Sequence, residues 1–124
     1  MNEYAIKINE FIQKNVGIAY KDKQNLVLII ESYLFLIDYY LILQTNNVKE
    51  RQVLLNSALH YAKSLGKYSF WRLKVFERAA KFYKEKDDEY RKNYFLCEAN
   101  KIRANIYGEG LDIKLREKKV FEKK

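Results

Sequence analysis

Apolar side chains are concentrated in residues 26–43, where 15 of 18 positions are apolar or aromatic. The three polar exceptions are Glu31, Ser32 and Asp38. Because seven residues complete almost two turns of an α-helix, Glu31 and Asp38 share one narrow stripe. A helix that is apolar around most of its circumference has to be covered by other helices. The pattern therefore predicts a central helix in a compact helical bundle.

The same stretch also has the length of a short transmembrane helix. Its two carboxylates oppose that interpretation, because each costs about 2.5–3.5 kcal/mol near the middle of a bilayer on insertion scales. The charged residues on its two sides give only a weak orientation signal. We therefore expect no membrane insertion, and a buried helix over residues 22–45 with Leu34 and Phe35 in the core.

Four further segments repeat apolar positions every three or four residues, which is the period of an amphipathic helix. Proline is absent, and no segment shows the strict alternation of a half-buried strand. Short connections between the segments favour antiparallel neighbours. The predicted helices span residues 2–16, 48–65, 69–86 and 88–107, and the glycines expected to end helices are Gly17, Gly66, Gly108 and Gly110.

The predicted fold class is therefore all-α, a compact bundle of about five mostly antiparallel helices around a central apolar helix. Ser69 precedes the helix over residues 69–86 as an expected N-cap. Residues 1–110 are expected to form the bundle domain. Residues 111–124 are expected to be a basic C-terminal helix or tail.

The predicted helix over residues 88–107 has a broad apolar arc made of two adjoining faces. Such an arc predicts contact with two neighbouring helices and places the single cysteine, Cys97, in the core. One face consists of Phe95, Ala99, Ile102 and Ile106, and the other of Tyr90, Tyr94, Cys97 and Ala104.

The net positive charge comes from the second part of the chain. Residues 1–50 contain 5 basic and 6 acidic residues, whereas residues 51–124 contain 19 and 10, for a net charge of +8 overall. Residues 51–84 hold eight basic residues against one acid, Glu77. On the helix over residues 69–86, three basic positions lie within about 60° of one another. These are Lys74, Arg78 and Lys81, with Trp71 and Phe70 beside them.

This basic row edged by an aromatic ring is the candidate binding surface. Lysine and arginine release counterions from phosphates, and an exposed ring offers a stacking surface for bases. The expected partner is nucleic acid or another polyanion, bound without sequence specificity. The predicted nucleic-acid-binding residues are Lys63, Lys67, Trp71, Arg72, Lys74, Arg78 and Lys81.

Two other interpretations of this surface stay open. In the first, the protein is a protein–protein interaction module, an inhibitor or an assembly subunit, whose partner is an acidic protein surface. In the second, the basic side chains only solvate the outer face while Trp71 packs between helices. The protein could form a homo-oligomer under each of these interpretations.

Patterns for catalysis, metals and cofactors were sought and not found in the sequence. With one histidine and one cysteine, the chain lacks the ligands of a zinc site. No glutamate lies three residues before His60, as a di-iron helix requires, and no glycine-rich phosphate loop occurs. We therefore expect no enzyme activity, no metal and no cofactor, and a solvated His60.

The carboxylate stripe of the central helix has a structural and a functional interpretation. Glu31 and Asp38 are expected to be an exposed sliver of the helix, or to be covered by a lysine from the helix over residues 2–16 or 48–65. The functional alternative is an internal polar site or a specificity device in an oligomer.

Cysteine usage and amino-acid composition bear on the location and the origin of the chain. A single cysteine and an N-terminus charged from Glu3 onward predict a cytoplasmic location. The frequent lysine, asparagine, isoleucine and tyrosine are typical of an AT-rich genome, as in a low-GC bacterium, a virus or a mobile element.

Overall fold

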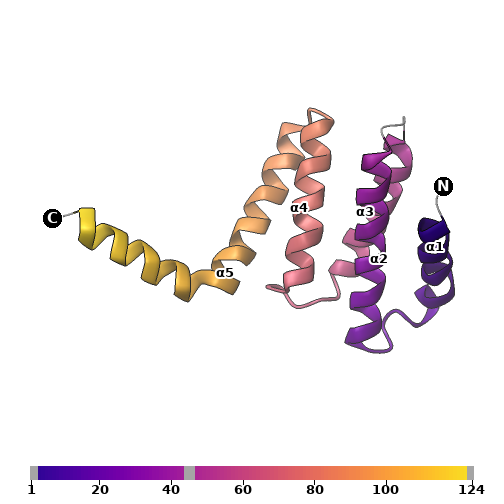
Figure 1. The fold of residues 1–124 in the computed structure, drawn as a ribbon, viewed down its shortest axis with the longest axis horizontal. Coiled ribbons are helices and arrows are strands. Elements are labelled where there is room, and N and C mark those ends of the chain that lie inside the picture. Colours follow the sequence, from indigo (N-terminus) through magenta and orange to yellow (C-terminus); the bar gives the residue numbers. More distant parts are fainter. Residues whose placement is uncertain (1–2, 44–46, 123–124) are drawn as a thin grey trace.

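The computed structural model describes the backbone of residues 3–43 and 47–122, and side chains as far as residue 108. Within these ranges the chain folds into five α-helices that alternate in direction along the chain (Figure 1). The predicted all-α bundle is confirmed. The helices are α1 (Glu3–Asn15), α2 (Lys23–Ile42), α3 (Val48–Ala62), α4 (Phe70–Glu85) and α5 (Glu89–Glu122), with a short 3₁₀ turn, η1 (Val16–Ile18), after α1.

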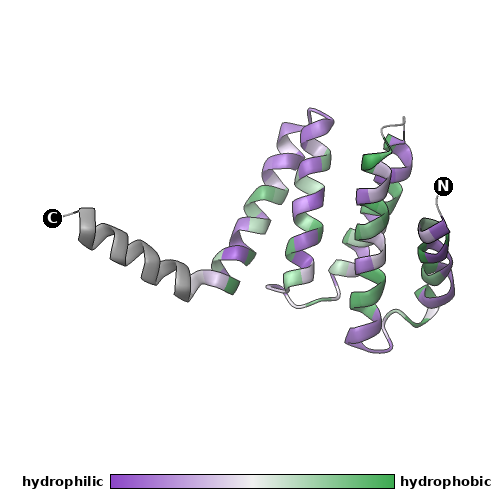
Figure 2. Ribbon diagram, in the orientation of Figure 1, coloured by the Kyte–Doolittle hydropathy of each residue, from purple (hydrophilic) through white to green (hydrophobic). Residues whose placement is uncertain are grey.

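Helix α2 is the central helix, because it packs against α1, α3 and α4 and supplies more residues to the main core than any other helix. Figure 2 shows that hydrophobic residues are frequent along α2, whereas α4 carries many hydrophilic ones. By length and composition alone α2 could cross a membrane, but the core helix of a bundle passes the same test. The main core around it contains Ile12 of α1, Ile29, Ile30 and Leu36 of α2, Leu55 and Ala58 of α3, and Val75 and Ala79 of α4.

One side of α2 is open, and this corrects the expectation for Phe35. Leu34 is buried with 5% of its surface exposed, but its neighbour Phe35 is 37% exposed. The Phe35 ring contacts Tyr4 of α1 and Tyr39, at centroid distances of 5.8 and 6.3 Å. Helix α1 is about 10 Å shorter than α2 at 1.5 Å per residue, so it covers only part of that side. Beyond its end Ile42 is 76% exposed.

A second, smaller core joins α4 to α5. Leu73 and Phe76 of α4 pack there against Ala99 and Ile102 of α5, with Phe95 at its edge. The adjoining face of α5 is not covered by any described helix, because α5 is the last helix and lies at the edge of the bundle (Figure 1). The prediction of two neighbours for α5 was therefore wrong. The exposed residues on that face include Tyr90, Tyr94, Cys97 and Ala104, so the core position predicted for Cys97 was also wrong.

The predicted N-cap residue begins its helix, but two of the glycines expected to end helices do not. The predicted cap is confirmed, because the Ser69 hydroxyl accepts a hydrogen bond from the Trp71 amide at 3.2 Å. Gly108 and Gly110 do not end α5, which continues to Glu122. A glycine inside a helix costs only about 1 kcal/mol relative to alanine. None of the described glycines adopts a positive φ, so no left-handed cap forms there.

A buried arginine ties three helices together at one end of the bundle. Arg51 of α3 is 5% exposed and donates two hydrogen bonds, of 2.7 and 2.8 Å, to the Glu85 carboxylate at the end of α4. Its Nε donates to Asn47 Oδ1, and Asn47 Nδ2 donates to the Tyr40 carbonyl of α2. The guanidinium also lies 5.7 Å from the centroid of the Phe82 ring. Because Arg51 binds it, the pKa of Glu85 is lowered.

The turn between α4 and α5 contains the left-handed residue Asp87, with φ of 57°. The amide of Asp88 donates to the Tyr83 carbonyl at 2.9 Å, and that of Asp87 donates to the Lys84 carbonyl at 3.1 Å. This pair of hydrogen bonds is a Schellman motif, whose left-handed position is usually a glycine. The Asp88 side chain then accepts a hydrogen bond from the Arg91 amide and begins α5.

Replacing Asp87 with glycine is expected to raise the free energy of unfolding by about 0.5–1 kcal/mol. A left-handed conformation costs a non-glycine residue about 1–2 kcal/mol, and glycine's greater freedom in the unfolded chain returns part of the gain. Urea denaturation followed by circular dichroism would measure it. Asp87→Ala, the control, should lower stability, and a glycine variant less stable than the wild type would contradict the assignment.

Candidate functional site

The seven predicted binding residues do not share one surface, which corrects the single basic face expected from the sequence. Helix α4 separates them, because Arg72 and Lys74 are 200° apart around the helix at 100° per residue. Lys74 lines a hollow between α2 and α4 together with Arg78 and Lys81. Arg72 lines a groove on the other side, together with Lys63, the residue that follows α3.

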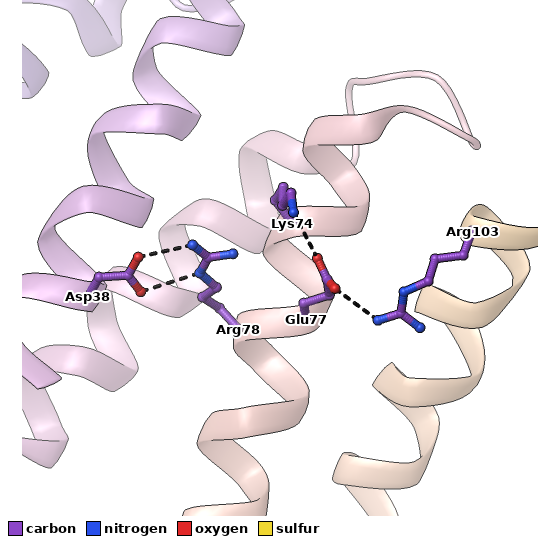
Figure 3. A network of polar contacts seen from close by, with 5 residues as sticks. All are labelled: Asp38, Lys74, Glu77, Arg78 and Arg103. Atoms are coloured by element: carbon purple, nitrogen blue, oxygen red, sulfur yellow. Dashed lines mark hydrogen bonds and ion pairs between the residues drawn. The ribbon is translucent and has the colours of Figure 1, made fainter. Parts of the chain in front are cut away.

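In the α2–α4 hollow the basic side chains lie beside acids. The hollow encloses about 480 Å³. Arg78 donates two hydrogen bonds to the Asp38 carboxylate, from Nε at 3.3 Å and from Nη2 at 3.0 Å (Figure 3). This ion pair joins α4 to the central helix. The hollow is lined by Asp38, Leu41, Ile42, Lys74, Glu77, Arg78 and Lys81.

Glu77, which also lines this hollow, contacts two further cations (Figure 3). Its Oε2 accepts a hydrogen bond from Arg103 of α5 at 2.9 Å, and its Oε1 lies 3.6 Å from the Lys74 ammonium. Burial by itself would raise the pKa of Glu77, but the contacts with Arg103 and Lys74 outweigh it and lower the pKa. Lys74 and Arg78 are therefore already paired with carboxylates.

These contacts also settle where the carboxylate stripe of α2 lies. Asp38 is half-buried and covered by an arginine of α4, and not by a lysine of α1 or α3 as the sequence suggested. Glu31 is exposed and lies apart from it, in an apolar hollow between α1 and α2. The two acids therefore do not form a joint site.

Of the two aromatic rings expected beside the basic row, Phe70 is exposed and Trp71 is half-buried. Trp71 is half-buried and packs against the main core, as in the interpretation that gave it a structural role. The exposed ring beside Lys74 is Phe70, 41% exposed, with the Lys74 ammonium 5.0 Å from its centroid. Lys67 lies in the connection between α3 and α4, with its ammonium 5.5 Å from the Tyr68 ring.

The groove on the other side of α4 is the better candidate site. It encloses about 340 Å³ between α3, α4 and α5, and no carboxylate is among its lining residues. Within the part of the chain that the structure describes, neither Lys63 nor Arg72 forms an ion pair with an acid. We call it the α3–α4–α5 groove, and it is lined by Asn56, Leu59, His60, Lys63, Arg72, Phe76, Tyr94 and Phe95.

Three aromatic rings form one wall of this groove. The Arg72 guanidinium lies 5.4 Å from the centroid of Phe76, which is 8% exposed. Phe76 contacts Phe95 at 5.6 Å, and Phe95 contacts Tyr94 edge to face at 5.1 Å. Tyr94 is 54% exposed. The rings thus run from a buried floor to an exposed rim, next to two unpaired cations.

His60 lies at the same groove and is exposed, as predicted. Its Nε2 is 3.1 Å from the hydroxyl of Tyr20, which precedes α2. The sequence pattern did not identify Phe76, Tyr94 or Phe95 as groove residues, because their spacing only placed them on apolar helix faces. Phe76 is buried in the core between α4 and α5, and the pairing of these two helices brings all three rings to the groove that Arg72 also lines.

Comparison of the chain with protein-family models, curated proteins and solved structures found no match. Among the described residues, no group of three or more histidine, cysteine, aspartate or glutamate side chains is placed to hold a metal ion.

Proposed function

We propose that this protein is a non-enzymatic binding protein whose ligand is nucleic acid or a similar polyanion, held in the α3–α4–α5 groove. The observation that supports this proposal is the meeting of two unpaired cations, Lys63 and Arg72, with exposed aromatic surface in a groove without carboxylates. Phosphate and an aromatic base are the two chemical groups that such a lining complements.

The distribution of ion pairs favours this groove, and not the row of cations on the opposite side of α4, as the polyanion-binding site. A phosphate that approached Arg78 or Lys74 would have to compete with Asp38 and Glu77, which already hold them. A phosphate that approached Lys63 or Arg72 would not have to displace a carboxylate. The net charge of the second part of the chain adds a long-range attraction for any polyanion, which raises the association rate at low salt.

Removing the two groove cations should weaken polyanion binding more than removing two other cations does. We expect Lys63→Gln with Arg72→Gln to lose at least about tenfold in affinity for an oligonucleotide near 0.1 M salt. The slope of log affinity against log salt should fall by about 1.4–1.8, because each phosphate contact contributes about 0.7–0.9. Fluorescence anisotropy with a labelled oligonucleotide would measure both quantities.

The matched control is Lys81→Gln with Lys84→Gln, which removes the same charge from exposed positions of α4 outside the groove. It should lower the affinity for the oligonucleotide only slightly, through the weaker electrostatic field of the whole protein. An equal loss in the two double variants would contradict the groove. A wild-type protein that binds neither oligonucleotide nor heparin at low salt would contradict polyanion binding altogether.

A second candidate function is that of a protein-interaction module, and the apolar hollow between α1 and α2 favours it. Ile8, Phe11, Leu28 and Phe35 line this hollow, and Leu28 and Phe35 are 41% and 37% exposed. Exposed apolar surface of this kind is common at protein interfaces. Association through it should respond little to salt, whereas polyanion binding should weaken steeply as salt rises.

A further inference from the structure

The shape of the α3–α4–α5 groove bears on which form of nucleic acid it can hold. Its volume of about 340 Å³ lies near the lower end of the range of about 300–1,000 Å³ that is usual for small-ligand sites. That is room for one small ring system with its attached groups. A double helix presents rows of phosphates on its outside and keeps the faces of its bases stacked inside. A duplex would therefore lie across the groove without filling it.

The aromatic wall of the groove can stack only on a base whose face is exposed. Tyr94 is 54% exposed although it stands edge to face with the half-buried Phe95. An unpaired base can stack on such a ring, and this contact tolerates any sequence because every base has a π-face. Tyr94 and Phe95 lie on α5, whereas Arg72 lies on α4 and Lys63 follows the last residue of α3. The base and its phosphates would thus meet different helices.

We propose that the groove takes an unpaired nucleotide of a single strand, with the base against Tyr94 and the neighbouring phosphates on Lys63 and Arg72. This inference rests on the proposed function and narrows it to single-stranded nucleic acid. The lining agrees with it, since two cations without carboxylate partners stand beside an exposed ring, and no acid is present to repel a phosphate.

The experiment compares binding of oligo(dT), a duplex of the same length and poly-glutamate to the full chain at one salt concentration. Oligo(dT) is expected to bind at least about tenfold more tightly than the duplex, because only the single strand gains base stacking. Poly-glutamate carries negative charge without bases and should bind more weakly than oligo(dT).

Tyr94 variants test the stacking contact itself. Tyr94→Leu should lower the affinity for oligo(dT) about 5- to 150-fold, the loss that corresponds to a stacking energy of about 1–3 kcal/mol. Tyr94→Phe keeps the ring and should bind like the wild type. Tyr90→Leu is the matched control, because Tyr90 is an exposed tyrosine one turn earlier on α5, is 84% exposed, and does not line the groove.

The results distinguish this inference from the proposed function. Duplex binding as tight as that of oligo(dT), or equal affinities of Tyr94→Leu and Tyr90→Leu for oligo(dT), would overturn the single-strand inference. Polyanion binding at Lys63 and Arg72 would still stand if the double glutamine variant lost affinity. Poly-glutamate binding as tight as oligo(dT), or tighter, would overturn the inference in favour of an acidic protein partner.

Discussion

Replacing Leu34 with alanine should lower the free energy of unfolding by about 2–5 kcal/mol, the usual cost of leaving a cavity in a packed core. Leu34 is 5% exposed and belongs to the main core around α2. Alanine is the best helix former, so the loss reports packing and not helix propensity. Urea denaturation followed by circular dichroism would measure it.

The adjacent residue provides the matched control for this prediction. Phe35→Ala removes a larger side chain from the same helix, but Phe35 is 37% exposed and contacts mainly the rings of Tyr4 and Tyr39. Its loss should therefore cost about 1 kcal/mol, close to the centre of the distribution for point mutants. If Phe35→Ala destabilised the protein as much as Leu34→Ala, the open side of α2 would be covered in solution.

Replacing Glu85 with alanine should lower the free energy of unfolding by about 2–4 kcal/mol, because it leaves the Arg51 guanidinium buried without its charge partner. The Arg51 side chain is 6% exposed, whereas that of Glu85 is 45% exposed. Water around Glu85 screens part of the interaction, which places the expected loss below that of a fully buried pair.

Replacing the other partner, Arg51, should lower the free energy of unfolding by less. The difference between the two variants is the sharper test of the roles of Arg51 and Glu85. Arg51→Met keeps much of the volume beside Phe82 and leaves a Glu85 carboxylate that water can reach. Removing one partner of an ion pair is costly when the charge that is left behind stays buried, and here that charge is the half-exposed Glu85 carboxylate. Denaturant titrations of the two variants decide the matter, since an Arg51→Met variant less stable than Glu85→Ala would contradict the assigned roles.

The same ion pair predicts a dependence of stability on pH. Arg51 lowers the pKa of Glu85 in the folded protein, so the pair contributes its full stability only above the pKa of an unfolded glutamate, about 4.3. That contribution is lost as the pH falls through the lowered pKa of the folded state. Glu85→Gln should therefore show a smaller loss of stability on acidification than the wild type.

Part of the candidate site followed from the sequence and part did not. Lys63 and Arg72 were among the predicted binding residues, and both line the α3–α4–α5 groove. Lys74 and Arg78 were predicted as free cations, but Glu77 and Asp38 hold them. Asp38 lies 40 residues from Arg78 in the sequence. No local pattern connects two such positions, because their contact depends on how α2 and α4 are packed.

Sequence by itself determined the features that depend on neighbouring residues. The helical segments, the cap at Ser69, the central position of α2 and the concentration of positive charge after residue 50 all follow from periodicity, side-chain chemistry and composition. The helical segments and the cap arise within a few turns of one helix, where spacing fixes which residues share a face, and the other two features follow from composition.

Only the tertiary structure decided which faces are covered and which charges are free. Phe35 and Cys97 are exposed despite apolar surroundings in the sequence, because α1 leaves a hollow beside α2 and α5 lies at the edge of the bundle. Arg51 is buried despite its charge, because Glu85 reaches it from α4. Burial and ion pairing are properties of two helices at once, so the relative placement of helices determines them, and the amphipathic pattern of one helix alone does not.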